Sequence, residues 1–192
     1  MNTFIVSKGE IILILGGARA GKSAFALRLA RDREIAAAGR ICFIATAAPL
    51  DEEMRARIAR HREERPPDWL TIEEPKRLDT AIAEARNAQV VIVDCLTLFV
   101  SNWFMDIEDE RACEREIEPI VENFLAIAAK SEQTIICVSN EVGLGLVPET
   151  SLGRLFRDAL GRVNQRIARA ASQVYLLVAG LPIQLKPDGK AK

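Results

Sequence analysis

The chain has 192 residues, 49% of them hydrophobic, and its formal net charge is −1, with 26 lysines and arginines against 27 aspartates and glutamates. This length predicts one domain over 1–192, with an N-terminal extension at 1–10 and a frayed tail at 183–192. The charge balance gives no reason to expect nucleic acid as a partner. No apolar run is long enough for a membrane span, and no C-x-x-C pair is present, so we expect a soluble protein of the reducing cytoplasm.

Short apolar runs alternate with longer helical patterns along the chain. Five runs are rich in aliphatic residues and predict strands buried on both faces, at 11–15, 41–45, 90–93, 135–138 and 174–178, with a further short strand at 69–73. Helices are expected at 22–31, 51–64, 76–87, 109–130 and 151–171, with Pro119 kinking or dividing the fourth. This alternation predicts an α/β fold of the P-loop NTPase type, an open and mainly parallel sheet with helices on both faces.

The first strand runs directly into a glycine-rich loop with the pattern G-x-x-x-x-G-K-S. Glycines at its first and sixth positions let backbone amides turn toward a phosphate, and the helix that follows adds its positive N-terminal end. Lys22 is placed to reach the β- and γ-phosphates, and the Ser23 hydroxyl to bind Mg²⁺. We therefore expect a nucleotide phosphate site formed by Gly16, Gly17, Ala18, Arg19, Ala20, Gly21, Lys22 and Ser23.

Asp94 follows the strand at 90–93, where a second Mg²⁺ ligand is expected. Such an acid holds the metal directly or through water; the alternative is an aspartate that only caps the next turn.

His61 is the only histidine of the chain. It shares an apolar stripe with Met54 and Ile58 near the end of the second predicted helix, so a structural role is one interpretation. The other is catalytic, because several arginines surround it: cationic neighbours favour a neutral imidazole and also bind phosphate oxygens. These arginines are Arg57, Arg60, Arg62 and Arg65, and pairing with nearby acids on a solvated face is their alternative role.

An ordered series of motifs spans about residues 11–181 and resembles one enzyme family. After the phosphate loop come F-I-A-T-A at 43–47, D-x-E-M-x-x-R-I-x-x-H-x-x-x-R-P at 51–66, V-D-C-L-T at 93–97, S-N-E-V-G-x-G-x-V-P at 139–148 and R-D-x-x-G-x-x-N-Q at 157–165. The series is similar to that of the bifunctional adenosylcobinamide kinases / adenosylcobinamide-phosphate guanylyltransferases of cobalamin biosynthesis.

The resemblance implies two reactions. ATP or GTP first phosphorylates the aminopropanol hydroxyl of adenosylcobinamide. GTP then transfers GMP to a histidine, releasing pyrophosphate, and adenosylcobinamide phosphate takes the GMP to give adenosylcobinamide-GDP. The family's guanylylated histidine falls on His61, which is covalent catalysis through an N–P intermediate.

The resemblance also implies contacts to the nucleotide from two further segments, with Asp94 near the metal. A carboxylate at Glu73 is suited to read the two donor groups of guanine. The remaining residues implied to bind nucleotide are Ala45, Thr46, Ala47, Arg62, Glu63, Glu64 and Arg65. Asn140, Glu141, Arg157 and Asp158 are expected near the substrate without an assigned role, and Gly143 and Gly145 form either a turn or lid, or an ordinary loop.

Several points stay open on sequence alone. Ala20 stands where the family commonly has serine, which predicts only a modest loss of phosphate contacts. The family implies a homo-oligomer, described as a trimer, and the apolar residues at 98–100 and 103–105 are expected to favour a contact surface over a buried strand. Two other functions compete: a P-loop kinase or NTPase for another substrate with a structural His61, and a nucleotide-gated binding module.

Overall fold

The computed structural model describes residues 9–37, 40–49, 51–63, 65–106 and 112–187. They form a seven-stranded sheet of order β3-β2-β4-β5-β1-β6-β7, parallel except for β7. The strands are β1 (Glu10–Gly16), β2 (Ile41–Ala45), β3 (Leu70–Glu73), β4 (Val90–Asp94), β5 (Thr134–Val138), β6 (Gln173–Val178) and β7 (Leu181–Lys186). The α/β class, the five longer strands and the short strand near 69–73 are therefore confirmed.

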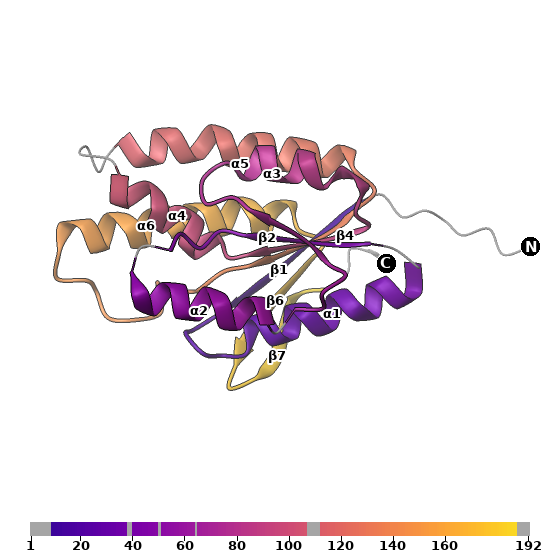
Figure 1. Cartoon of the computed structure of the whole chain (residues 1–192). Coiled ribbons are helices and arrows are strands. Elements are labelled where there is room, and N and C mark those ends of the chain that lie inside the picture. The colour runs from indigo at the N-terminus through magenta and orange to yellow at the C-terminus, as the bar shows by residue number, and fades with distance from the viewer. Residues whose placement is uncertain (1–8, 38–39, 50, 64, 107–111, 188–192) are drawn as a thin grey trace, which may run out of the picture.

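Helices cover both faces of the sheet. Figure 1 shows α1 (Lys22–Ala37) and α2 (Glu52–Glu63) on one side, and on the other α3 (Leu78–Glu84), α4 (Leu96–Asp106), α5 (Ala112–Lys130) and α6 (Ser151–Ala170). A 3₁₀ turn at Ala85–Asn87 ends the α3 segment. Pro119 lies inside α5 and does not divide it. None of the helices within the described residues combines the length and apolar character needed to cross a membrane.

The two faces of the sheet carry separate apolar cores because side chains alternate along each strand. Ile11, Leu13 and Leu15 of β1 pack with residues of α3, α4, α5 and α6. Ile12 and Ile14 point the other way and pack in the core that includes Phe25, Ala26 and Ala30 of α1. This packing fixes the carboxyl ends of β1, β2, β4 and β5 along one edge, where ligands of open α/β sheets bind.

Two expectations about the chain ends were wrong in part. The segment expected as a frayed tail forms β7, which pairs antiparallel with β6. The chain reverses at Ala179 and Gly180, both with positive φ, and β7 covers the otherwise open edge of β6. At the other end Glu10 is already part of β1, while residues 1–8 and 188–192 lie outside the described residues.

The expectation for the apolar segment around residues 98–105 was also wrong in part. The segment forms α4, a helix rather than a strand, and Phe99 and Val100 are fully buried in the core instead of lying at a contact surface. Trp103 and Phe104 are partly buried against the same core, and only Met105 is clearly exposed. The helix packs against both α5 and α6 and contributes to the core, so it buries more than one side and its sequence does not show one apolar stripe.

Candidate functional site

The phosphate loop lies between the end of β1 and the start of α1, as the sequence predicts. Gly21 has φ +89, a left-handed conformation that favours glycine, and it precedes the first residue of α1. Lys22 is largely buried, and its Nζ donates to the carbonyl of Gly17 at 2.6 Å across the loop. The loop is thus closed on itself by the lysine that the motif assigns to phosphates.

Neighbouring strands limit the residues that the loop can carry. A Cβ at Gly16 would come within 2.6 Å of the carbonyl oxygen of Leu177, so glycine is required there. Ala20 is held by backbone hydrogen bonds to Gly17 at 3.3 Å and from Gly180 at 3.1 Å. These contacts anchor the loop to the β6–β7 turn, while Gly17, Ala18 and Arg19 are exposed.

Ser23 and Asp94 meet at the carboxyl end of the sheet. Burial raises the pKa of Asp94, and a hydrogen bond from the Ser23 side chain opposes that rise. Electrostatic interactions with His61, Arg65 and Lys22 act on the Asp94 pKa in the same direction as Ser23. A hydroxyl from the phosphate loop and a carboxylate from a strand end are oxygen ligands of the kind that Mg²⁺ takes in nucleotide sites. The two residues therefore fit that ion.

His61 shares one cavity with Ser23 and Asp94. The cavity has a volume of about 80 Å³, and its lining residues come from the phosphate loop, the ends of β2, β3 and β4, and the inner side of α2. They are Ser23, Ala45, Ala47, Met54, Ile58, His61, Arg65, Glu73, Asp94, Cys95 and Leu98. The stripe of Met54, Ile58 and His61 thus faces the cavity, and the histidine that the sequence placed beside apolar residues shares this cavity with Ser23 and Asp94.

The arginines near His61 have different surroundings in the structure. Arg65 lines the cavity, and its guanidinium carbon lies 3.7 Å from the centre of the Phe43 ring. Arg62 is exposed and forms an ion pair with Glu73, and Arg60 is exposed. The side chain of Arg57 lies outside the described residues. Of the described arginines in the predicted cluster, Arg65 is the one that shares the cavity with the imidazole.

The segment after β2 contributes to the site in two ways. Ala45 and Ala47 line the cavity, whereas the Thr46 side chain is fully buried. The Thr46 hydroxyl donates to the carbonyl of Cys95 at 2.7 Å and accepts from the Cys95 amide at 2.8 Å. The peptide bond between Asp94 and Cys95 is cis. Thr46 therefore fastens the turn that follows Asp94, while its alanine neighbours face the cavity.

A second, open groove continues from the cavity along the outer edge of the sheet. Arg65 and Glu73 line both, and the groove also contains Arg62 and Glu63 together with Pro66, Pro67, Trp69 and Thr71. Glu64, which the family resemblance places among the nucleotide contacts, lies outside the described residues. Arg62, Glu63, Arg65 and Glu73, all expected to contact nucleotide, therefore line one groove.

Some lining residues were not anticipated as site residues. Met54, Ile58 and Cys95 belong to motifs given above but were not predicted as site residues, and Leu98 was expected only as part of the apolar segment 98–100. The available signal for Met54 and Ile58 is their spacing with His61, because one side of a helix faces one environment.

The cavity brings His61 together with Ser23 of the phosphate loop and with Asp94. Within the described residues, no group of three or more histidine, cysteine, aspartate and glutamate side chains is arranged to hold a metal ion. A divalent ion at Ser23 and Asp94 would thus complete its ligand set with phosphate oxygens and water. This arrangement defines a P-loop nucleotide-binding enzyme with a histidine in the same cavity.

Comparison with known proteins agrees with this class and narrows it. The family model described as cobinamide kinase / cobinamide phosphate guanyltransferase matches residues 12–185. The chain therefore belongs to this family of bifunctional kinases and guanylyltransferases. It is 39% identical to the bifunctional adenosylcobalamin biosynthesis protein CobU of Escherichia coli, with 92% of this chain and 99% of the relative covered. It is 42% identical to CobP of Pseudomonas aeruginosa, with 92% and 97% covered.

A solved structure supports the fold alone. The flagellar accessory protein FlaH of Methanocaldococcus jannaschii superposes with a TM-score of 0.55 at 18% identity, covering 94% of this chain and 80% of that one. The P-loop type of α/β sheet is thereby confirmed independently of the family match.

Proposed function

We propose that the chain phosphorylates the hydroxyl of adenosylcobinamide from ATP or GTP and then transfers GMP from GTP, through His61, to the phosphate it has made. The observation that carries the assignment of His61 is its place in the same cavity as Ser23 and Asp94. A nucleotide whose phosphates lie on the loop extends from there toward α2.

In the transfer step an imidazole nitrogen of His61 attacks the α-phosphorus of GTP. The bond from that phosphorus to the bridging oxygen of the β-phosphate breaks, and its electron pair leaves with pyrophosphate. A phosphate oxygen of adenosylcobinamide phosphate then attacks the same phosphorus and returns the electron pair to the imidazole. The covalent intermediate divides one difficult displacement into two.

Other residues of the cavity have supporting roles in this proposal. Ser23 and Asp94 would hold Mg²⁺, which would neutralise charge that develops on the phosphates. Arg65 and Glu73 line the same cavity as His61. In this proposal Arg65 would bind phosphate oxygens beside the imidazole, and Glu73 would accept from the donor groups of guanine. Glu73 forms an ion pair with Arg62, and both residues line the open groove. We further propose that the protein works as a homo-oligomer in the cytoplasm.

The first test is labelling of the protein with GTP carrying ³²P at either the α- or the γ-phosphate, in the presence of Mg²⁺. We expect label from the α-position only, stable to base and released by acid, because an N–P bond to histidine has those stabilities. The variant His61→Ala is expected to bind GTP with unchanged affinity and to take up no label. A labelled His61→Ala protein would exclude His61 as the carrier.

A matched control separates loss of chemistry from loss of structure. Arg60 lies next to His61 on α2 and is exposed, so Arg60→Ala is expected to label like the unaltered protein. If the unaltered protein binds GTP and takes up no label, the chain is a P-loop kinase or NTPase in which His61 is structural.

A further inference from the structure

The turn that follows β5 is tied to the phosphate loop by backbone hydrogen bonds. The Ser139 amide donates to the carbonyl of Ile14 at 2.9 Å, and the Glu141 amide donates to the carbonyl of Gly16 at 3.1 Å. The parallel ladder between β1 and β5 thus continues beyond both strands, as far as the first glycine of the loop. Glu141 is therefore fixed beside the place where the phosphates bind.

Two buried polar side chains hold the residue before it. The backbone amide of Asn140 donates to the Thr97 hydroxyl at 2.7 Å. The backbone carbonyl of Asn140 accepts from Nδ2 of Asn164 at 3.1 Å. Thr97 is 9% exposed and Asn164 is 5% exposed, and they come from α4 and α6 on the helix-rich face of the sheet. Burying polar groups costs free energy unless they are hydrogen-bonded. Because the buried side chains of Thr97 and Asn164 make hydrogen bonds to the backbone of Asn140, they hold the turn in one conformation.

The Glu141 carboxylate is oriented and still able to accept. Its Oε1 atom accepts from the Gly143 amide at 2.9 Å, which uses one of the acceptor positions on the two oxygens. The side chain is half-buried, and the loop beyond it is open: Leu144 is 78% exposed and Leu146 is 96% exposed. A large acceptor can therefore approach Glu141 from solvent without crossing the nucleotide cavity.

The order of the strands separates this turn from the histidine. β5 lies between β1, which carries the phosphate loop, and β4, which carries Asp94. Glu141 does not line the cavity that contains His61. The residues for guanylyl transfer and for phosphorylation would thus lie on different sides of one phosphate loop. His61 would act at the α-phosphate, and Glu141 at the terminal phosphate.

We infer that Glu141 is the residue that orients the acceptor hydroxyl and receives its proton in the kinase step. This inference rests on the proposed kinase function. The hydroxyl oxygen attacks the γ-phosphorus, and the bond from that phosphorus to the β,γ-bridging oxygen breaks, its electron pair leaving with the nucleoside diphosphate. The hydroxyl proton passes to the Glu141 carboxylate and then to water. General bases of this kind contribute about 10²–10⁴-fold to rate.

The test is the variant Glu141→Gln, because glutamine keeps an oxygen that can accept from the Gly143 amide and removes the base. We expect its kcat for phosphate transfer from [γ-³²P]ATP to adenosylcobinamide to fall about 100-fold or more. The KM for ATP, the labelling of His61 by GTP and GMP transfer to supplied adenosylcobinamide phosphate should stay within about threefold of the unaltered protein. Glu149→Gln, an exposed glutamate of the same loop, is the control and should behave like the unaltered protein.

Each alternative outcome has its own meaning. Kinase activity in Glu141→Gln within about threefold of the unaltered protein overturns the inference, and so does an equal loss of kinase activity and His61 labelling, which would mark a structural role. Glu141→Asp, which retains a shifted carboxylate, should recover part of the kinase rate, and no recovery above Glu141→Gln would count against a base. Absence of kinase activity in the unaltered protein would instead overturn the proposed kinase function.

Discussion

Thr46 acts at the scale of a single residue by holding the backbone that presents Asp94 to the cavity. Its hydroxyl makes two hydrogen bonds to Cys95, the residue after Asp94, and its own carbonyl accepts from Nδ2 of Asn102 at 2.8 Å. Asn102 is itself buried and also donates to the carbonyl of Pro75 at 3.0 Å. The buried side chains of Thr46 and Asn102 thus connect the ends of β2 and β4 with the loop after β3.

The variant Thr46→Val should lower the free energy of unfolding by about 2 kcal/mol, because it leaves the Cys95 amide without its partner and removes one of the two hydrogen bonds to the Cys95 carbonyl, which also accepts from the Phe99 amide. Thr46→Ser keeps the hydroxyl and should recover most of this loss. Urea denaturation measures both. Thr80→Val, at an exposed position of α3, is the control and should change stability by less than about 0.5 kcal/mol. A Thr46→Val protein as stable as its parent would show that the two hydrogen bonds are not needed.

At the scale of the element, the start of α3 shows how one carboxylate can fix a helix. The Asp79 carboxylate accepts from Nε and Nη2 of Arg77, both at 3.0 Å, and from the Thr80 amide at 3.0 Å. It lies in the first turn of α3, where negative charge is favoured by the helix dipole. The hydrogen bond from Arg77 is the main cause that lowers the pKa of Asp79 from its ordinary value of 3.8, against the opposing effect of burial.

This lowered pKa gives a prediction with a defined sign. The unfolded chain binds the Asp79 proton more readily than the folded one, so the carboxylate stabilises the fold above pH 3.8, and that contribution is lost as pH falls through the folded pKa. Asp79→Asn should therefore cost about 1.5 kcal/mol near neutral pH. The difference from the unaltered protein should shrink toward zero in acid.

Urea denaturation between about pH 7 and about pH 3 checks this prediction. Asp32→Asn, which removes an exposed carboxylate of α1, is the matched control and should show little difference at any pH. A constant difference between Asp79→Asn and the unaltered protein over the whole range would mean that the charge of Asp79 has no part in the stabilisation.

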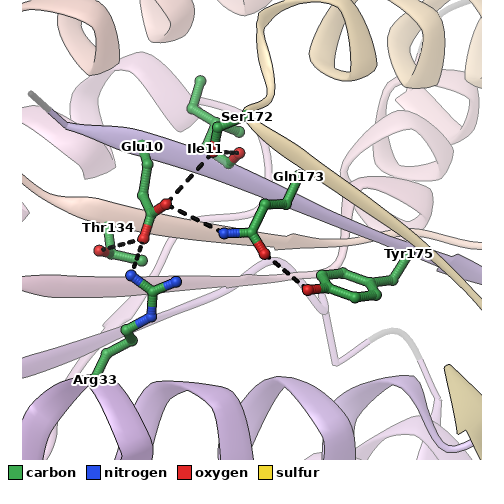
Figure 2. A network of polar contacts seen from close by, with 7 residues as sticks. All are labelled: Glu10, Ile11, Arg33, Thr134, Ser172, Gln173 and Tyr175. Carbon is green, nitrogen blue, oxygen red and sulfur yellow. Dashed lines mark hydrogen bonds and ion pairs between the residues drawn. The ribbon is translucent and has the colours of Figure 1, made fainter. Parts of the chain in front are cut away.

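At the scale of the whole molecule, Glu10 joins elements that are far apart in the chain. Figure 2 shows its carboxylate between Arg33 of α1, Thr134 of β5, and Ser172 and Gln173 at the start of β6. It forms an ion pair with Arg33 and accepts from Thr134 at 3.3 Å, Gln173 at 3.4 Å and Ser172 at 3.5 Å. The side chain is 14% exposed, so the network is partly screened from water.

The network extends toward the antiparallel edge of the sheet. The Tyr175 hydroxyl donates to Oε1 of Gln173 at 2.7 Å, as drawn in Figure 2, and accepts from Nε2 of Gln184 of β7 at 3.3 Å. The Glu10 carboxylate lies at the amino-terminal end of β1, and the phosphate loop lies at the other end of the same strand. Stability and nucleotide binding should therefore respond separately to changes at Glu10.

Glu10→Ala should lower the free energy of unfolding by about 2–3 kcal/mol, because several hydrogen bonds to one charged group are lost and their donors are left at a partly buried site. The affinity for GTP, measured by calorimetry, should stay within about twofold of the parent. Glu132→Ala, at an exposed glutamate before β5, is the control for stability. A Glu10→Ala protein that keeps its stability and loses GTP affinity would contradict the separation of the two ends.

Features that depend on a few neighbouring residues could be predicted from sequence. The phosphate loop is one, because its conformation follows from Gly16, Gly21 and Lys22 between a strand and a helix. The buried parallel strands are another, because continuous aliphatic runs have few other solutions. The strand at 181–186 was missed although Leu181, Ile183 and Leu185 alternate, because these residues are exposed and lie next to a polar, proline-containing terminus.

The sequence by itself therefore determined the class of fold, the family and the identity of His61 as the candidate nucleophile. Only the tertiary structure decided where side chains point: that Met54, Ile58 and His61 face the cavity, that Thr46 turns inward to Cys95, and that Arg62 pairs with Glu73. The physical reason is that a motif of eight residues fixes its own backbone. The direction of a side chain, in contrast, depends on how elements distant in the chain pack across the sheet.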